Sequence, residues 1–122
     1  MKILIIDDSK VNLIMVSKML EQLGNTVYRA NDGNQAYEII SKNPQIDLIF
    51  LDWCMPVMSG SDFLTKNLEE SLFTIPVIIM TTDQESLVIN QAKKIGAIDY
   101  ISKPFTTLRL EEKLIELFDY TA

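Results

Sequence analysis

The chain has 122 residues, close to the usual size of one domain, and 48% of them are apolar. Its net charge of -6 argues against direct binding to nucleic acid, because proteins of that class gain affinity by neutralising phosphates. With no histidine and a single cysteine, Cys54, histidine-dependent nucleophilic triads, an internal disulfide and a multi-cysteine metal site are excluded. No apolar run approaches the roughly 20 residues that span a bilayer. We therefore expect one cytosolic domain over residues 1–122, without membrane insertion.

Taken in chain order, five short apolar segments alternate with five segments of helical periodicity. The expected strands are residues 3–6, 26–30, 47–51, 76–80 and 98–101. The expected helices are residues 9–23, 33–42, 61–67, 85–95 and 107–118. Continuous apolar runs of this length suit strands that are buried on both faces of a parallel sheet. The alternation predicts a doubly wound α/β domain without repeats or linkers.

The first helix has the clearest pattern. Ser9 can cap its start, and Gly24 can end it. The apolar face that we expect to be buried consists of Met15, Val16, Met19, Leu20 and Leu23.

Three carboxylates follow two of the expected strands. Asp7 and Asp8 come after the first strand, and Asp52 comes after the third. Any one of them is more often a turn former or a helix cap than a ligand. However, ligands of such folds bind beyond the carboxyl ends of the strands, and the three side chains converge there if the two strands are neighbours. Their mutual repulsion then requires a cation, and an all-oxygen site of this kind suits Mg²⁺.

A hydroxyl and a cation stand at the ends of two further strands. Thr81 ends the fourth and can bond a phosphoryl oxygen, while Lys103 ends the fifth and can neutralise its charge. Neither residue is a specific signal alone. Together with a metal ion they supply most of what phosphoryl transfer requires, so Asp52 is the candidate nucleophile and would form an acylphosphate.

Four motifs in register resemble the receiver domain of response regulators in two-component signalling, and in particular the single-domain chemotaxis regulators. They are IIDDS at residues 5–9, LDWCMPVMSG at 51–60, PVIIMTT at 76–82 and GAIDYISKPF at 96–105. The resemblance extends over the full length. It implies a flavodoxin-like fold, in which five helices flank a five-stranded parallel sheet of strand order 2-1-3-4-5.

The resemblance also assigns the metal site. It implies that Asp52 is the phosphoacceptor and that Asp8 and Asp52 bind Mg²⁺ directly. Asp7 would bind the metal largely through water, and the backbone carbonyl of Cys54 would supply a further ligand.

The same resemblance assigns a switch. Thr81 and Lys103 would contact the phosphoryl group, and the peptide between Lys103 and Pro104 would be cis. Tyr100 would swing inward when Thr81 moves, changing the surface formed by the fourth helix, fifth strand and fifth helix. On its own, Tyr100 is equally well explained as a half-buried strand aromatic.

Partners follow from the resemblance as well. A histidine kinase or a histidine phosphotransfer domain would supply the phosphoryl group, and a downstream protein would receive the signal. Such a donor would dock on Val11, Leu13 and Ile14 of the first helix, although scattered exposed apolar residues are common without any such role. The chain would be a monomer or a weak phosphorylation-dependent dimer. It would not be an enzyme beyond transfer to itself and autodephosphorylation.

Other functions remain open at this stage. A phosphatase of the haloacid dehalogenase type also uses a strand-end aspartate, but it needs a second aspartate two residues later, where this chain has Cys54. A pseudo-receiver that only binds partners is the main alternative. Flavin or dinucleotide binding is disfavoured because no glycine-rich turn follows the first strand.

Overall fold

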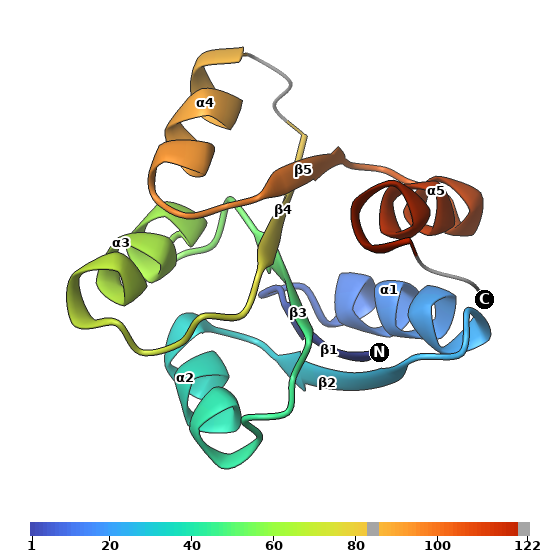
Figure 1. Cartoon of the computed structure of the whole chain (residues 1–122), viewed down its shortest axis with the longest axis horizontal. Coiled ribbons are helices and arrows are strands. Elements are labelled where there is room, and N and C mark those ends of the chain that lie inside the picture. Colours follow the sequence, from blue (N-terminus) through green and yellow to red (C-terminus); the bar gives the residue numbers. More distant parts are fainter. Residues whose placement is uncertain (83–85, 120–122) are drawn as a thin grey trace.

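The computed structural model describes residues 1–82 and 86–119, in which five strands alternate with five helices (Figure 1). The strands are β1 (Lys2–Ile6), β2 (Thr26–Ala30), β3 (Leu48–Asp52), β4 (Val77–Thr81) and β5 (Asp99–Ser102). The helices are α1 (Lys10–Gln22), α2 (Gly33–Lys42), α3 (Gly60–Glu70), α4 (Ser86–Lys94) and α5 (Thr107–Phe118). None of these helices is long and apolar enough to cross a membrane.

All strands pair in parallel, in the order β2-β1-β3-β4-β5. This confirms the predicted doubly wound fold and its strand order. The three inner strands are buried along almost their whole length, which explains why they appear in the sequence as continuous apolar runs. The edge strand β2 is mostly half-exposed, and its apolar run is correspondingly weaker.

The predicted bounds of β2, α2 and α5 agree with the structure, and the others differ at their ends. α3 begins one residue earlier than expected and continues to Glu70. Its start is fixed by a capping box, in which the Asp62 amide donates to Ser59 Oγ and the Ser59 amide donates to Asp62 Oδ2, both at 3.1 Å. Residue 85, the expected first residue of α4, lies outside the described residues. Asp52 is the last residue of β3 rather than the residue after it.

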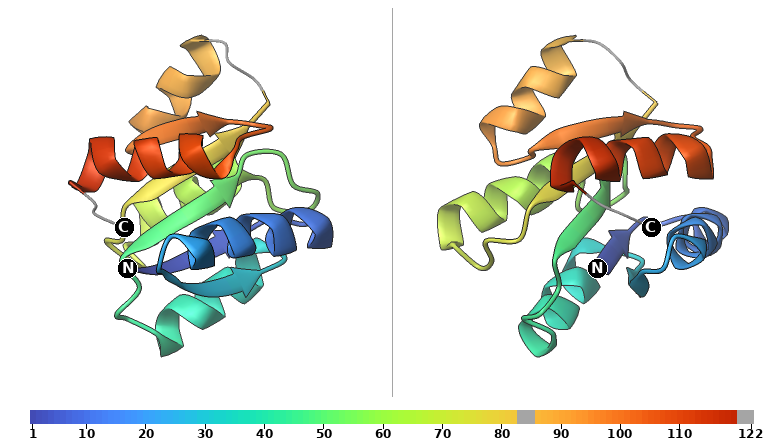
Figure 2. Two further views of the ribbon diagram at one scale, coloured as in Figure 1. Left: turned by 90° about the vertical axis from the view of Figure 1, so that its right-hand side faces the viewer. Right: turned by 45° about the vertical axis from the view of Figure 1, so that its right-hand side comes forward.

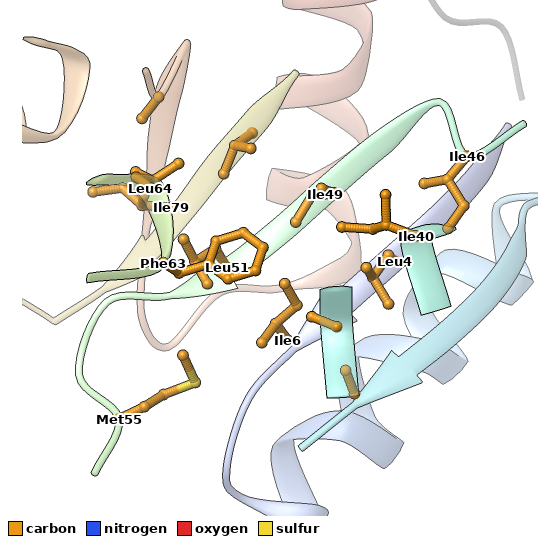
Figure 3. Close-up of a cluster of buried hydrophobic side chains, with 14 of the residues drawn as sticks. Leu4, Ile6, Ile40, Ile46, Ile49, Leu51, Met55, Phe63, Leu64 and Ile79 are labelled. Atoms are coloured by element: carbon orange, nitrogen blue, oxygen red, sulfur yellow. The ribbon is translucent and has the colours of Figure 1, made fainter. Parts of the chain in front are cut away.

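Two apolar cores cover the two faces of the sheet. On one face α1 and α5 pack against the strands, and on the other face α2, α3 and α4 do so, an arrangement visible in Figures 1 and 2. Figure 3 shows part of the second core, where Phe63 and Leu64 of α3 approach Leu51 and Ile79 of the sheet. Strands enclosed in this way leave only their ends for polar chemistry.

The predicted buried face of α1 is partly wrong. Met15 is 50% exposed, whereas Leu13 is only 6% exposed. The residues that α1 buries are Leu13, Val16, Ser17 and Leu20. Ser17 is tolerated there because its hydroxyl accepts a hydrogen bond of 2.8 Å from Arg29 Nε on β2. The buried face of α1 therefore includes Ser17 and leaves Met15 outside it.

The glycines that begin α2 and α3 give a matched stability prediction. A Cβ at Gly60 would lie 2.9 Å from both the Asp52 carbonyl oxygen and Trp53 Cα, which are backbone atoms that cannot move aside. At Gly33 it would meet the flexible end of the Met58 side chain. We expect Gly60→Ala to lower the free energy of unfolding by about 2 kcal/mol, and Gly33→Ala to cost less than half of that. Urea unfolding of both variants tests this, and equal losses would contradict it.

Candidate functional site

Three carboxylates meet at the carboxyl edge of the sheet. Asp7, Asp8 and Asp52 each offer an oxygen, and these oxygens all lie within 4.8 Å of one another. They converge because β1 and β3 are neighbours, with Ile6 paired to Leu51, so the residues that follow this pair emerge side by side. Asp7 and Asp52 are buried and Asp8 is exposed. The structure therefore brings together the three aspartates that the sequence singled out.

Lys103 neutralises part of this cluster. Its ammonium bonds Asp7 Oδ2 at 3.1 Å and Asp52 Oδ1 at 3.0 Å, and its side chain is only 18% exposed. The contact follows from strand alternation, because Lys103 continues the side of β5 on which Ile101 faces the core beneath α1 and α5. Lys103 was predicted to contact a phosphoryl group, and in the structure its ammonium bonds two of the carboxylates.

Two backbone amides also support the carboxylates, and the sequence analysis missed both. The Ser9 amide donates to Asp7 Oδ1 at 2.9 Å, and the Cys54 amide donates to Asp52 Oδ1 at 3.4 Å. Ser9 was predicted only as a helix cap, which it also is, since its hydroxyl accepts from the Asn12 amide at 3.2 Å. An aspartate two residues before a serine at a strand-to-helix junction is the signal for such a turn.

The electrostatics of the cluster favour a cation. Burial, reinforced by the negative charge of Asp7, raises the pKa of Asp52 from 3.8 to about 6 despite the hydrogen bond from Lys103. Burial lowers the pKa of Lys103, but the hydrogen bonds and charges of Asp52 and Asp7 outweigh it, so the pKa of Lys103 is raised. The donors are all oxygens that carry or share negative charge, which is the set that Mg²⁺ prefers. The residues present therefore fit a divalent cation.

Thr81 and Tyr100 share the opposite face of the sheet. Thr81 is the last residue of β4 and continues the alternation of Ile79, which faces the core beneath α2, α3 and α4. Tyr100 is half-buried and packs against the same core. The carbonyl oxygen of Thr81 accepts a hydrogen bond of 2.8 Å from the Lys103 amide, so the ends of β4 and β5 are directly linked. The peptide between Lys103 and Pro104 is cis, as the resemblance implied.

The candidate docking residues on α1 separate into two kinds. Val11 and Ile14 are exposed, by 65% and 46% respectively. Leu13 is buried and belongs to the core between α1 and the sheet, so its assignment to a docking surface is wrong. Met15, four residues after Val11 and therefore on the same side of α1, is also exposed and lines an apolar groove of about 300 Å³ together with Lys103 and Phe105.

Comparisons with known proteins agree with the fold. Residues 3–115 match the model of the response regulator receiver domain family. The chain is 38% identical to chemotaxis protein CheY-3 of Vibrio cholerae, over 98% of this chain and 92% of that protein. It is 37% identical to chemotaxis protein CheY1 of Helicobacter pylori, over 93% and 94% of the two chains.

Solved structures give the same result. The structure is similar to that of chemotaxis protein CheY4 of Vibrio cholerae, with a TM-score of 0.88, 31% identity, and coverage of 96% of this chain and 98% of that one. It is also similar to a two-component response regulator from Clostridium difficile, with a TM-score of 0.86, 30% identity, and coverage of 97% and 95%. This chain therefore belongs to the response regulator receiver family of two-component signalling.

Proposed function

We propose that this receiver accepts a phosphoryl group on Asp52, with the help of Mg²⁺, and thereby switches a surface that controls a partner protein. The observation that carries the proposal is the cluster of three carboxylate oxygens within 4.8 Å, joined by the ammonium of Lys103. A structural role alone would not require three carboxylates to be crowded at one point, because their repulsion opposes folding. A phosphoacceptor site that binds Mg²⁺ does require clustered carboxylates, because they hold the ion.

The donor is the phosphohistidine of a histidine kinase or a histidine phosphotransfer domain. A carboxylate oxygen of Asp52 attacks phosphorus, the bond between phosphorus and the imidazole nitrogen breaks, and its electron pair stays on that nitrogen. Bound Mg²⁺ supplies positive charge to the phosphoryl oxygens in this chemistry. Asp8, Asp52 and the backbone carbonyl of Cys54 would hold the ion directly, and Asp7 largely through water.

Lys103 has two successive roles in this proposal. Before the reaction its bonds to Asp7 and Asp52 offset part of the carboxylate repulsion. Afterwards its ammonium exchanges Asp52 for a phosphoryl oxygen, as a charge-assisted hydrogen bond. The receiver acts only on itself: water later hydrolyses the acylphosphate, and no other substrate is turned over.

The signal leaves through α4, β5 and α5. Thr81 bonds the phosphoryl group through its hydroxyl, and Tyr100, on the same face of the sheet, moves inward toward the space that Thr81 gives up. The phosphoryl group thus shifts a population between two conformations, with a coupling that is typically about 1 to 3 kcal/mol. The downstream partner binds the shifted surface, and the receiver itself is a monomer or pairs weakly when phosphorylated.

The donor domain docks beside the site on α1. Val11 and Ile14 expose apolar surface there, and the groove between Met15 and Phe105 adjoins Lys103. Exposed apolar side chains around a polar site are typical of a surface that a partner covers. The reaction takes place in the cytosol, in keeping with the family and with the free Cys54.

The first prediction tests the metal and phosphoryl site. Beryllofluoride mimics the bound phosphoryl group, and Trp53 is adjacent to Asp52 in the sequence, so we expect a saturable change in Trp53 fluorescence that requires Mg²⁺. Asp52→Asn should abolish this change, because the mimic needs the carboxylate oxygen. No response in the wild-type protein, together with no Mg²⁺ binding in calorimetry, would contradict the proposal and favour a receiver that acts by contact alone.

The second prediction concerns metal-free stability. Because folding raises the pKa of Asp52 from 3.8 to about 6, the fold loses stability as the pH rises through this window, and the destabilisation is complete above it. Asp52→Asn, which stays neutral, should raise the free energy of unfolding by roughly 2 kcal/mol at about pH 8, and by about half of that at about pH 5. Urea unfolding at both pH values measures the difference.

Adding Mg²⁺ should make the wild type more stable than Asp52→Asn, because the ion stabilises only the wild-type cluster. Glu69→Gln, which removes an exposed carboxylate from α3, is the control and should show neither effect. A metal-free wild type more stable than Asp52→Asn at about pH 8 would show that Lys103 already compensates the charge of Asp52.

The third prediction tests donor docking. Ile14→Asp places a charge in the exposed apolar surface of α1 and should slow phosphotransfer from the kinase at least about tenfold, as expected for loss of a central contact. Phosphorylation by acetyl phosphate should be unchanged, because this small donor needs no docking surface. Leu68→Asp, which makes the same change at a 60% exposed leucine of α3, is the matched control and should behave like wild type. Equal effects of Ile14→Asp on both donors would contradict docking on α1.

A further inference from the structure

A buried lysine on α5 plays no part in the site described above. Among residues 1–82 and 86–119, Lys113 is the one lysine or arginine that is buried, with 4% exposure. Its ammonium bonds Asp99 Oδ2 of β5 at 3.0 Å and lies 5.5 Å from the centre of the Tyr100 ring. Such a charge is costly to remove from water unless it is paired, so these contacts are the compensation for its burial.

The carboxylate of Asp99 connects this cation to the strand. While its Oδ2 binds Lys113, its Oδ1 accepts a hydrogen bond of 2.8 Å from the backbone amide of Tyr100. Both the main chain and the ring of Tyr100 are therefore held by the same ion pair. Because β5 is the edge strand of the sheet, one ammonium on α5 can reach both the carboxylate and the ring.

The ring contact gives the ion pair an influence over where Tyr100 lies. A cation over an aromatic face is attracted by the ring, and the attraction is strongest when the cation is shielded from water, as it is here. If the Tyr100 ring moves inward, Lys113 keeps its ion pair with Asp99 but loses its contact with the ring. The contact therefore favours the conformation in which Tyr100 lies beside Lys113.

We infer that Lys113, paired with Asp99, is a positioning residue that holds Tyr100 in its resting place and so lowers the population of the switched conformation. The inference rests on the proposed function, because it assumes that Tyr100 moves when the phosphoryl site is filled. Lys113 touches neither the metal nor the phosphoryl group in this scheme, and it acts through Tyr100 alone.

The experiment removes the pair without leaving either charge unpaired. In Asp99→Asn with Lys113→Met the net charge is unchanged, so the field at the site that binds the anion is preserved. With the cation gone, we expect the beryllofluoride concentration for half-saturation of the Trp53 signal to fall about twofold to tenfold. In protein labelled with 3-fluorotyrosine, the fluorine resonance of Tyr100 should move toward its beryllofluoride-bound position before any beryllofluoride is added.

Asp99→Asn alone separates positioning from a loosened α5. In this variant the amide oxygen at position 99 can still accept a hydrogen bond from the ammonium and keep it over the ring, so the half-saturating concentration should equal or exceed that of the wild type. If simple loosening of α5 were the cause, the single variant would lower this concentration as the pair does, which would overturn the inference.

Two further variants complete the test. Lys66→Met removes a similar contact elsewhere, where the ammonium of Lys66 lies 4.9 Å from the centre of the Tyr37 ring, and it should change nothing. In a Tyr100→Leu background, removing the Asp99 and Lys113 pair should give no further gain, because the ring on which it acts is absent.

The inference would be overturned if the Tyr100 resonance and the half-saturating beryllofluoride concentration were unchanged in the double variant. It would also be overturned if removal of the pair lowered this concentration equally in the Tyr100→Leu background. A wild-type protein that does not respond to beryllofluoride would instead contradict the proposed function. In that case the Tyr100 resonance has no bound position with which to be compared, and the inference fails together with the proposed function.

Discussion

The repulsion among three carboxylates at one edge of the sheet is the constraint on which the rest of the structure depends. Asp7, Asp8 and Asp52 are forced together because β1 and β3 are neighbours. The cation that offsets this repulsion, Lys103, is distant in the sequence, 96 positions from Asp7. It reaches the cluster only because β4 and β5 extend the sheet in the right order. The strand order is therefore as much an electrostatic requirement as a way of burying apolar surface.

Much of the fold could be predicted from the sequence because burial on both faces leaves a strong local pattern. The inner strands β1, β3 and β4 are almost wholly buried, so their apolar runs are continuous. The orientation of α1 could not be predicted in the same way. The face that α1 buries includes a serine, Ser17, whose partner Arg29 comes from a different element. Periodicity within a helix contains no information about such a partner, and so Met15 was placed in the core incorrectly.

The candidate site shows the same division between local and distant information. Once the fold is known, the convergence of the three aspartates follows from topology alone. The burial of Lys113 does not follow, because a lysine on an amphipathic helix is usually exposed. Its partner Asp99 is 14 positions away on β5, where a single aspartate is an unremarkable strand residue. A pair of opposite charges that become buried together is visible only when both elements have been placed.

The two lysines also suggest why β5 is suited to carry a signal. Lys103 follows the carboxyl end of this strand and bonds the carboxylates, whereas Lys113 binds Asp99 at its first residue. Tyr100 lies between them, and the link between the Lys103 amide and the Thr81 carbonyl fixes the strand to its only neighbour, β4. An edge strand has one such neighbour, so it can shift at lower cost than an inner strand. Under the proposed function, a change of partner at Lys103 therefore acts on the strand that carries Tyr100, and the contact of Lys113 with the Tyr100 ring sets how readily the receiver switches.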